Sequence, residues 1–421
     1  MPTFATTDTS HLTDSIGDIK RAHKELVQAR HESDRLFEIL LPQFLYDRPI
    51  AERHRVVFYV GHLDAFDYIQ NCREGLGVQS PEPALDALFQ AGIDPDSGHL
   101  PMDAPSDWPT LDRIKAYVNK TREAVDRLLE EAPADAVHMA LEHRLMHLET
   151  LAYMFHNFPH EKKTRPPLSE SITGSSAIPV HSKWCTVEKG EAVLGKARDG
   201  SFGWDNEYSE HRVTVPAFRM QRYKVTNGEY LRFVDDGAPL PSFWVRSGDG
   251  LNYRGMFESI PLPMDWPAYV TQREAQAYAG WLGKELPSEQ QFHRAAFGTH
   301  SQCSREYPWG NSPPNHTLGN FDFKRWDPEP VTATSLNESA FGVLQMLGNG
   351  WEWTNTQFGP FEGFAASPHY PGYSANFFDS QHFVLKGGSP RTAARLLRRS
   401  FRNWFRPDYP YVYATFRCVE N

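Results

Sequence analysis

The segment from residue 136 to residue 155 constrains the fold most, because it lacks Gly and Pro and its apolar residues recur at helical spacing. One apolar stripe recurs at steps of three and four residues: Leu141, Leu145, Leu148, Ala152 and Phe155. A second apolar line contains His143 and His147, so the helix is apolar on two faces. The pattern therefore predicts a long, mostly buried helix whose two histidines point into a helical bundle.

Histidines at positions i and i+4 present their nitrogens to a common point, which is a recurrent metal-binding geometry. A pair of ordinary interior histidines is the alternative interpretation. We expect a third ligand from residues 56–68, where His62 lies in line with Phe58 and Phe66 at helical steps. Three neutral histidines leave open positions on a metal ion, as a catalytic site requires. The sequence therefore predicts a metal site on His62, His143 and His147.

Three other polar residues in or next to this helix are alternative candidates for metal ligands. His138 and His156 are close in sequence to the histidine pair but fall on other faces of the helix. Glu149 lies about 140° around the helix from the histidine face, at roughly 100° per residue. It shares a polar line with Glu142 and His156, and we expect Glu149 to be solvated and not a ligand.

The composition indicates a globular protein of more than one domain. A chain of 421 residues is too long for one ordinary hydrophobic core, and its net charge of −10 argues against a general nucleic-acid binder. No apolar run approaches the ~18 residues of a membrane span, and no signal-peptide core is present, so we expect a cytoplasmic protein without a membrane partner. Its four scattered cysteines fit a reducing compartment and exclude a zinc cluster of closely spaced thiolates. The oligomeric state is left open.

The first 160 residues predict a four-helix bundle. Residues 1–14 are expected to form a flexible tail, with Thr13 or Asp14 capping the first helix. Three further segments with helical spacing are expected to form helices at residues 14–41, 50–75 and 110–131. The loop at residues 76–108 is rich in Pro, Gly and Asp and is longer than a bundle connection needs, which indicates a function. Residues 15–160 would then enclose inward-facing metal ligands.

The second part of the chain has a different pattern of residues. Residues 161–179 are polar and interrupted by prolines, and we expect them to form a linker. From residue 180 to residue 421, short apolar segments and frequent turn signals indicate an irregular α+β domain. Two helices are expected there, one at residues 271–282 and one beginning at Ser288.

Several phrases of this second domain are long and specific: Tyr223-Lys-Val-Thr-Asn-Gly-Glu-Tyr230, Tyr307-Pro-Trp-Gly-Asn311, Leu347-Gly-Asn-Gly-Trp-Glu-Trp-Thr354, Lys386-Gly-Gly-Ser389 and Ser400-Phe-Arg-Asn-Trp404. Together they resemble the formylglycine-generating-enzyme fold, a C-type-lectin-like domain, over nearly all of residues 180–421. The bundle, with a lone His followed by His-x-x-x-His-x-Glu, resembles the DinB-like metal domain. The two domains in this order resemble the EgtB family of ergothioneine-biosynthesis sulfoxide synthases.

The resemblance implies that the three histidines bind a non-haem ferrous ion, Fe(2+), and that O2 is a substrate. The enzyme would join the sulfur of a thiol to the imidazole carbon of N-α-trimethylhistidine (hercynine) and leave a sulfoxide. It also implies an active site between the domains, with substrate contacts from Met146, Arg402, Asn403, Trp404 and Phe405. Asn403 and Trp404 would contact the betaine end of hercynine, where an indole beside a quaternary ammonium has a cation–π rationale. Core packing of Trp404 is the alternative.

Departures from the family patterns bear on the chemistry. The formylglycine enzymes carry two copper-binding cysteines where this chain has none, near Thr392 and Leu397, which argues against that oxidase chemistry. The EgtB branch that uses γ-glutamylcysteine carries Asp where this chain has Phe405, and paired arginines where residues 77–108 contain no Arg or Lys. Cysteine is therefore the expected sulfur donor. Six arginines remain as possible carboxylate clamps: Arg391, Arg395, Arg398, Arg399, Arg402 and Arg406.

The same branch carries a catalytic tyrosine in a Tyr-x-Pro-Tyr pattern, whereas this chain reads Phe358-Gly-Pro-Phe361. A phenolic proton donor must then come from elsewhere, and four candidates are left open: Tyr153, Tyr409, Tyr411 and Tyr413. Other functions also stay open. They are a selenoneine synthase that takes a selenosugar, a γ-glutamylcysteine-using hercynine sulfoxide synthase, a zinc-dependent thiol transferase, and a lectin-like binding module on a degenerate bundle.

Overall fold

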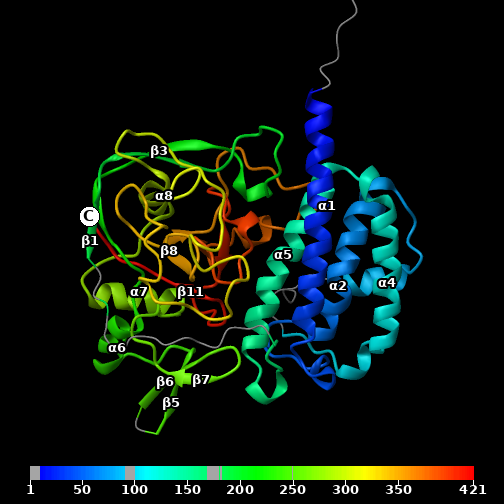
Figure 1. The fold of residues 1–421 in the computed structure, drawn as a ribbon, viewed down its shortest axis with the longest axis horizontal. Coiled ribbons are helices and arrows are strands. Elements are labelled where there is room, and N and C mark those ends of the chain that lie inside the picture. The colour runs from blue at the N-terminus through cyan, green and yellow to red at the C-terminus, as the bar shows by residue number, and fades with distance from the viewer. Residues whose placement is uncertain (1–9, 91–99, 168–179, 181–182, 249) are drawn as a thin grey trace, which may run out of the picture. The chain divides into compact units, whose positions relative to one another are not determined.

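The computed structural model describes residues 10–90, 100–167, 180, 183–248 and 250–421, with side chains from residue 19 onwards. It divides the chain into two compact units, Met1–Thr164 and Arg165–Asn421. The first unit is helical, and the second combines short strands with helices (Figure 1). Each unit is described by itself below.

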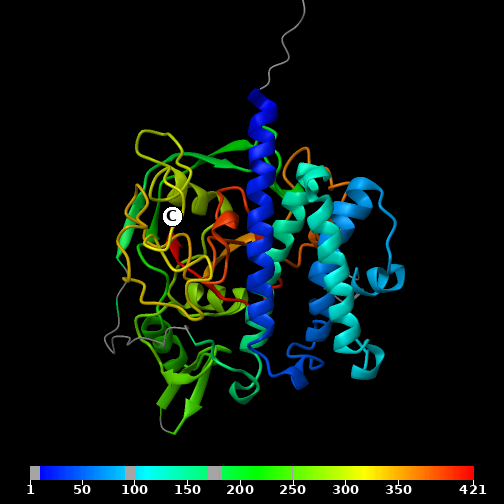
Figure 2. The ribbon, with the colours of Figure 1, turned by 45° about the vertical axis from the view of Figure 1, so that its right-hand side comes forward.

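Long helices dominate the helical unit: α1 (Ser10–Phe37), α2 (Val56–Tyr68), α4 (Leu111–Leu128) and α5 (Ala134–His156). They run side by side in both views (Figures 1 and 2). Among these pairs, α1 packs chiefly on α5 and α2 packs chiefly on α4. Shorter elements connect them: η1 (Pro42–Phe44), α3 (Pro83–Phe89), η4 (Pro105–Asp107), η5 (Leu129–Glu131) and η6 (His160–Lys162). The two helices that carry the histidines are therefore not each other's main packing partners.

The helix ends differ in part from those expected. Helix α1 begins at Ser10, before the predicted caps Thr13 and Asp14, and it ends at Phe37. The chain then turns, so that Leu40 forms an antiparallel bridge with Lys163. Helix α2 continues as a π-helical turn, η2 (Ile69–Glu74). Thr110 caps α4, since its side chain accepts a hydrogen bond from the Arg113 N–H at 3.4 Å.

Helix α5 is buried on almost every face, including its polar line, and the solvation expected for Glu149 is wrong. Glu142 is 2% exposed, Glu149 is 8% exposed and His156 is fully buried. Apolar stripes on two faces of α5 are packed, so the line between them has no open side. Periodicity shows which residues are apolar, but it does not show that a helix is enclosed on its polar side as well.

The boundary between the units falls inside the segment expected to be a linker. Residues up to 164 stay with the helical unit, because the Thr164 N–H donates to the carbonyl of Ile39 at 2.7 Å. Arg165 belongs to the second unit, where it forms an ion pair with Glu258 and lies over the ring of Phe257. Residues 168–179 of the expected linker lie outside the described residues.

Short strands form four small sheets in the described part of the second unit. The first has the order β1-β4-β12, from β1 (Trp184–Val187), β4 (Phe218–Gln221) and β12 (Val419–Glu420). The largest has the order β10-β9-β8-β11, from β10 (Asn403–Phe405), β9 (Phe383–Lys386), β8 (Trp351–Gln357) and β11 (Ala414–Thr415). The others pair β2 (Gly190–Leu194) with β3 (His211–Val215), and β6 (Gly250–Arg254) with both β5 (Trp244–Ser247) and β7 (Ser259–Pro261).

Three capped helices belong to the second unit: α6 (Asn227–Asp235), α7 (Gln272–Trp281) and α8 (Glu289–Phe297). Each begins with a capping box, in which a Ser or Thr side chain and a side chain three residues later satisfy each other's backbone N–H groups. The predictions of α7 and of a helix after Ser288 are confirmed. Helix α6 was not predicted, although Thr226 and Glu229 carry the same signature.

Strand β10 holds the segment in which substrate contacts are expected. It pairs antiparallel with β9, with Asn403 opposite Leu385 and Trp404 opposite Val384. The buried strand β9 therefore fixes the register of these residues. None of the helices described is both long enough and apolar enough to cross a membrane.

Candidate metal centre

Three histidine side chains from two helices converge in the helical unit. His62 lies on α2, and His143 and His147 lie one turn apart on α5. The Nε2 atom of His147 is 3.2 Å from Nε2 of His62 and 3.1 Å from Nε2 of His143. One nitrogen from each ring lies within 4.8 Å of the others. The structure thus brings together the three histidines singled out from the sequence.

Aromatic rings enclose the three imidazoles. The ring of Phe58 stacks on His62 with centroids 4.7 Å apart, and the ring of Phe66 stacks on His143 with centroids 3.5 Å apart. Phe58, His62 and Phe66 follow at steps of four residues on α2, so one face of the helix presents all three. These rings restrict the imidazole orientations and exclude water from their faces.

A main-chain carbonyl sets the tautomer of His62. The Nδ1–H of His62 donates to the carbonyl of Phe89, with 2.6 Å between the nitrogen and the oxygen. This leaves the lone pair of Nε2 directed at the other two histidines. Metal-binding histidines usually donate their second nitrogen in this way. Phe89 ends α3, inside the 76–108 loop whose length suggested a function, but the sequence did not single it out.

The three imidazoles are neutral at pH 7. Burial lowers the pKa of His62 to about 4. Burial, together with the neighbouring histidines, also lowers the pKa of His143 and of His147 well below 6.5. Neutral imidazoles keep the lone pairs that a metal ion needs. The electrostatics of the site therefore favour metal binding over a cluster of protonated histidines.

The separations between the nitrogens also fit a single ion. Two nitrogen ligands at about 2.1 Å from one metal are about 3.0 Å apart at a 90° angle and about 3.4 Å apart at the tetrahedral angle. The observed 3.1 and 3.2 Å lie within this range. Imidazole suits Zn, Cu, Fe and Ni ions. The donor set therefore fits a metal with open positions and does not by itself choose iron.

Tyr59 is a neighbour of the site that the sequence reasoning missed. Its ring centroid lies 5.8 Å from that of His147 and 6.4 Å from that of His62, and the residue is fully buried. A signal was present, because Tyr59 precedes His62 by three residues and so lies on an adjacent part of the same helix face. A phenol thus lies against two of the three candidate ligands.

Comparison with known proteins now identifies the family. Residues 176–421 match the family described as "Sulfatase-modifying factor enzyme 1-like domain". The hercynine oxygenase of Mycolicibacterium thermoresistibile is 34% identical over 372 residues, which cover 80% of this chain and 80% of that protein. This chain belongs to the hercynine oxygenase family.

Other relatives agree with this assignment. The hercynine oxygenase of Mycolicibacterium smegmatis is 31% identical over 442 residues, covering 94% of this chain and 97% of that protein. Ergothioneine biosynthesis protein 1 of Neurospora crassa is 28% identical over 492 residues, covering 91% of this chain but only 56% of the fungal protein. The resemblance inferred from the motif phrases, to a family of ergothioneine biosynthesis, is confirmed.

The rival residues on α5 do not join the histidines. In the described parts of this hercynine oxygenase homologue, the triad is the only group of three or more His, Cys, Asp or Glu residues placed to hold a metal. His138 is 5% exposed and Glu149 is 8% exposed, but neither belongs to this group. Met146, predicted as a substrate contact, is half-buried and directly precedes His147.

One of the four candidate tyrosines lies in the helical unit. The hydroxyl of Tyr153 accepts a hydrogen bond of 3.1 Å from Nη2 of Arg53. The charge of Arg53 also contributes, after burial and His62, to the low pKa of His147. Tyr153 and the triad therefore share Arg53 as a neighbour.

In the second unit, Trp404 is part of an aromatic cluster. Its ring stacks on Phe358 with centroids 4.2 Å apart and an interplanar angle of 7°. Tyr373 meets it edge-on at 5.4 Å, and Phe377 lies at 5.6 Å. The Asn403 side chain accepts a 2.9 Å hydrogen bond from the Trp404 N–H. Trp404 is only half-buried, so the cluster is not a closed core.

The remaining tyrosines lie close to Phe405 or in the core of the second unit. Phe405 stacks on Tyr409 with centroids 5.2 Å apart, and Tyr409 meets Tyr411 edge-on at 5.0 Å. Tyr413 is 1% exposed and packs against Tyr269. Among these three, Tyr413 has the surroundings of a structural residue.

Most of the candidate arginine clamps are engaged within the second unit. Arg402 forms two hydrogen bonds with Glu289, of 3.0 and 3.1 Å, and two more with the carbonyls of Asn206 and Gly359. Arg398 binds Glu207, and Arg399 pairs with Glu210 at 3.3 Å. The Arg402 guanidinium thus uses four of its five N–H groups on the protein itself.

Two arginines from outside the 77–108 loop contact its described part. Arg55 donates to Asp103 at 2.9 Å, and Arg48 donates to the Pro101 carbonyl at 2.9 Å and also to Asp103. Both guanidinium groups are therefore paired with the loop's own acceptors. Residues 91–99 of the loop lie outside the described residues.

Proposed function

We propose that this member of the hercynine oxygenase family is an iron(II)- and O2-dependent sulfoxide synthase that joins the sulfur of cysteine to the imidazole carbon of hercynine. The observation that carries the proposal is the convergence of three neutral imidazoles, His62, His143 and His147, within 4.8 Å of one another. The names of the relatives support the acceptor, because two of them are hercynine oxygenases.

In this proposal the three histidines hold a ferrous ion through Nε2. A bound ferrous ion with open positions supplies the redox chemistry by which a thiolate and O2 react with the imidazole carbon. Phe58 and Phe66 hold two of the ligand rings in place and exclude water from them. The Phe89 carbonyl keeps the proton of His62 on Nδ1, so that Nε2 stays available.

Recognition of hercynine is assigned to Asn403 and Trp404. A quaternary ammonium is attracted to the face of an aromatic ring when it lies within about 6 Å of the ring centroid. Trp404 is half-exposed and has Tyr373 and Phe377 beside it, which is a suitable group of rings for a trimethylammonium. Arg402 stabilises the segment that carries Asn403 and Trp404 and does not bind substrate, because its guanidinium donates to Glu289 and to two main-chain carbonyls.

The choice of cysteine rests on groups that a longer thiol would need. A γ-glutamyl extension adds a carboxylate and moves the ammonium, and a buried charge without a partner is costly. Phe405 provides no carboxylate for that ammonium. Arg48 and Arg55, which contact the loop, are paired with Asp103.

This chain has phenylalanines at positions 358 and 361, where the related branch has tyrosines. The proton donor is therefore assigned to a tyrosine elsewhere in the chain. Tyr153 is the candidate that the geometry of the helical unit supports, since it shares Arg53 with His147. Tyr409 and Tyr411 stay as alternatives in the second unit. Replacing each with Phe and comparing the ratio of sulfoxide to oxidised thiol would identify the donor.

One assay tests the proposal. The metal-free protein is loaded anaerobically with iron(II) or zinc, mixed with hercynine and cysteine, γ-glutamylcysteine or a selenosugar, and exposed to air. We expect O2 uptake and a hercynine–cysteine sulfoxide, detected by mass spectrometry, with iron and cysteine. Thiol transfer with zinc and without O2 uptake would favour the transferase. No product with any donor would favour a binding module.

A further inference from the structure

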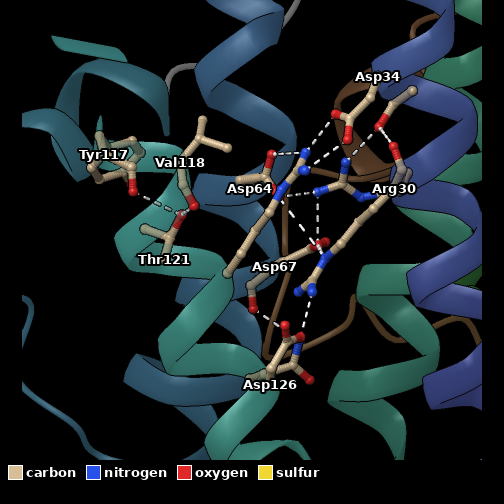
Figure 3. A network of polar contacts seen from close by, with 12 residues as sticks. Arg30, Asp34, Asp64, Asp67, Tyr117, Val118, Thr121 and Asp126 are labelled. Atoms are coloured by element: carbon tan, nitrogen blue, oxygen red, sulfur yellow. Dashed lines mark hydrogen bonds and ion pairs between the residues drawn. The ribbon is translucent and has the colours of Figure 1, made fainter. Parts of the chain in front are cut away.

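A network of charged side chains, buried at its centre and partly exposed at its edge, lies on the opposite side of α2 from His62. Its cations are Arg30, Arg122 and Arg144, and its anions are Asp34, Asp64, Asp67 and Asp126. Asp64 follows His62 by two residues, which places it about 200° around the helix. Figure 3 shows Arg30, Asp34, Asp64, Asp67 and Asp126 gathered between the helices. We call these seven residues the charge network.

Arg144 is the centre of the charge network. It directly follows His143 on α5, and its side chain is completely buried. Its Nη2 donates to Asp64 and to Asp67 at 2.7 Å each, and its Nη1 donates to Ser33 of α1 at 2.9 Å. One guanidinium thus links the two ligand-bearing helices, α2 and α5, and fastens both to α1.

The other two arginines attach the remaining helix. Arg122 of α4 forms two hydrogen bonds with Asp64, of 2.9 and 3.0 Å, and two with Asp34, of 2.8 and 2.7 Å. Arg30 of α1 contacts Asp67 at 3.4 Å and also binds Asp126 of α4. All four long helices of the unit therefore meet in the charge network.

Stability alone does not account for such a network, because well-packed apolar side chains would hold the helices together at least as well. Directional hydrogen bonds also fix the register of one helix against the next, which apolar contacts specify less strictly. Register matters here because α2 packs mainly on α4 and α5 mainly on α1, while the metal site needs ligands from α2 and α5 together.

We propose that the charge network is a positioning device for the histidine triad, in which the bonds from Arg144 to Asp64 and Asp67 fix His62 relative to His143 and His147. None of the seven residues touches the metal in this inference; they act through the helices. The inference rests on the proposed metal centre. Outer-shell groups that hydrogen-bond to metal ligands typically change metal affinity about 10–100-fold when they are lost, and we expect the lower part of that range for groups that position the ligand-bearing helices.

The test uses the full chain, metal-free, and Co(II) as the probe, since its absorption bands report both binding and coordination geometry. Arg144→Lys keeps the charge but loses the planar fork that reaches two carboxylates and Ser33. Asp67→Asn keeps the shape on α2 but removes one charge. We expect each to raise the Co(II) dissociation constant about 10-fold or more and to alter the absorption bands, at a temperature where both are folded.

Thr121→Val is the matched control. Thr121 is buried on α4 next to Arg122, but its hydroxyl bonds only to carbonyls of its own helix, at 2.9 and 3.2 Å (Figure 3). The Co(II) affinity and spectrum of the Thr121→Val variant should equal those of the wild type. This result would show that loss of a buried polar group in this region does not by itself weaken Co(II) binding.

Wild-type affinity and spectrum in folded Arg144→Lys and Asp67→Asn would overturn the inference while leaving the metal centre intact. Failure of both variants to fold would also overturn it, because the charge network would then be required for the fold itself. A wild-type protein that bound neither Co(II) nor Fe(II) would instead overturn the proposed metal centre, and with it this inference.

Discussion

The helical unit and the second unit both bury charged side chains in ion pairs, but in the second unit several of these side chains also bind main-chain carbonyls. In the helical unit, Arg122 and Arg144 bind side chains of neighbouring helices. In the second unit, Arg417 and Lys386 donate largely to main-chain carbonyls, such as those of Arg222 at 2.7 Å and Arg399 at 3.0 Å. Helices satisfy their own carbonyls, whereas irregular chain leaves carbonyls that need other donors.

This difference determines how each unit positions its functional residues. In the helical unit, the helical period determines which residues share a face of a helix, and long-range ion pairs fix the register between helices. In the second unit, Asn403 and Trp404 are held by a three-residue strand and by buried cations behind it, such as Lys386, which binds the carbonyls of Arg399 and Phe401. We therefore expect substitutions in the two units to affect different properties: metal binding in the first, and substrate binding or stability in the second.

The largest effect should come from the triad itself. His147→Ala removes one of three ligands, and we expect it to abolish both stoichiometric iron and sulfoxide formation. Metal analysis and product detection on the same sample measure the two losses. His138→Ala on the same helix is the matched control and should keep both. The ligand assignment is wrong if the outcomes of these two variants are reversed.

A buried ion pair of the second unit should affect stability without affecting the metal. Glu352 binds Lys224 at 2.7 Å and Arg417 at 2.8 Å, and all three side chains are completely buried. Glu352→Gln leaves two buried cations poorly compensated, so unfolding should become easier by about 3–5 kcal/mol. Urea unfolding measures this change, and Co(II) titration should give an unchanged dissociation constant.

Glu338→Gln is the control for that prediction, because its pair with Arg222 is partly exposed, with side-chain exposures of 40% and 26%. Its cost should be at most about 1 kcal/mol. A weakened metal site in Glu352→Gln at a temperature where it is folded would contradict the separation of roles between the units.

The metal-free protein should lose stability in acid through its histidines. The folded-state pKa of His62 is about 4, below the ordinary value of 6.5, so the unfolded chain takes up the proton first as the pH falls. The stabilising contribution is therefore complete above pH 6.5 and is lost between pH 6.5 and about pH 4. For His62 alone this amounts to roughly 3 kcal/mol.

Urea unfolding of the metal-free protein at several pH values between 7.5 and 4.5 would measure this loss. His62→Phe keeps an aromatic ring beside Phe58 but cannot take up a proton, so its dependence on pH should be shallower than that of the wild type. Equal slopes in the two proteins would show that His62 titrates normally in the folded state.

How far the sequence predicts the site also differs between the units. Helical spacing predicts that His62, His143 and His147 face inwards, because they lie on helix faces that apolar neighbours define, but it leaves ordinary interior histidines as an alternative. The bond from His62 to the Phe89 carbonyl spans 27 residues and ends on a main-chain atom, for which no side chain is a signal. The burial of Glu149 likewise depends on how α5 is enclosed, which its own period does not encode.

In the second unit, motif phrases identify the family but not the contacts. The Thr226 and Glu229 capping box would have predicted α6, so that omission was avoidable. The stacking of Trp404 on Phe358 was not predictable, because it joins two residues that lie 46 positions apart in the sequence. The engagement of Arg402 by Glu289 is similarly a tertiary contact, which only the folded chain shows.

Loss of the indole in Trp404→Ala should raise the KM for hercynine more than the KM for the thiol. A cation–π contact contributes about 0.5–2 kcal/mol, which corresponds to an increase of about twofold to about thirtyfold. Asn403→Ala should act in the same direction. Steady-state kinetics with each substrate varied in turn separates the two constants, and Trp281→Ala, a change at a partly exposed tryptophan of α7, is the control. An unchanged hercynine KM in both site variants would remove them from the binding site.

The smallest expected effect is on the selectivity for the sulfur donor. The native enzyme should have a higher kcat/KM for cysteine than for γ-glutamylcysteine, because Phe405 provides no negative charge to the displaced ammonium and the 77–108 loop provides no cation to the added carboxylate. Phe405→Asp should shift the ratio towards γ-glutamylcysteine. The shift should be partial, because Arg48 and Arg55 remain paired with Asp103 and cannot replace the missing loop arginines. Adding Asp103→Asn would remove the two ion pairs, while Arg48 and Arg55 keep their main-chain acceptors, and should move the ratio further. A native enzyme that uses both thiols equally well would show that neither Phe405 nor the loop selects the donor, and that another cation, such as the exposed Arg406 directly after β10, meets the second carboxylate.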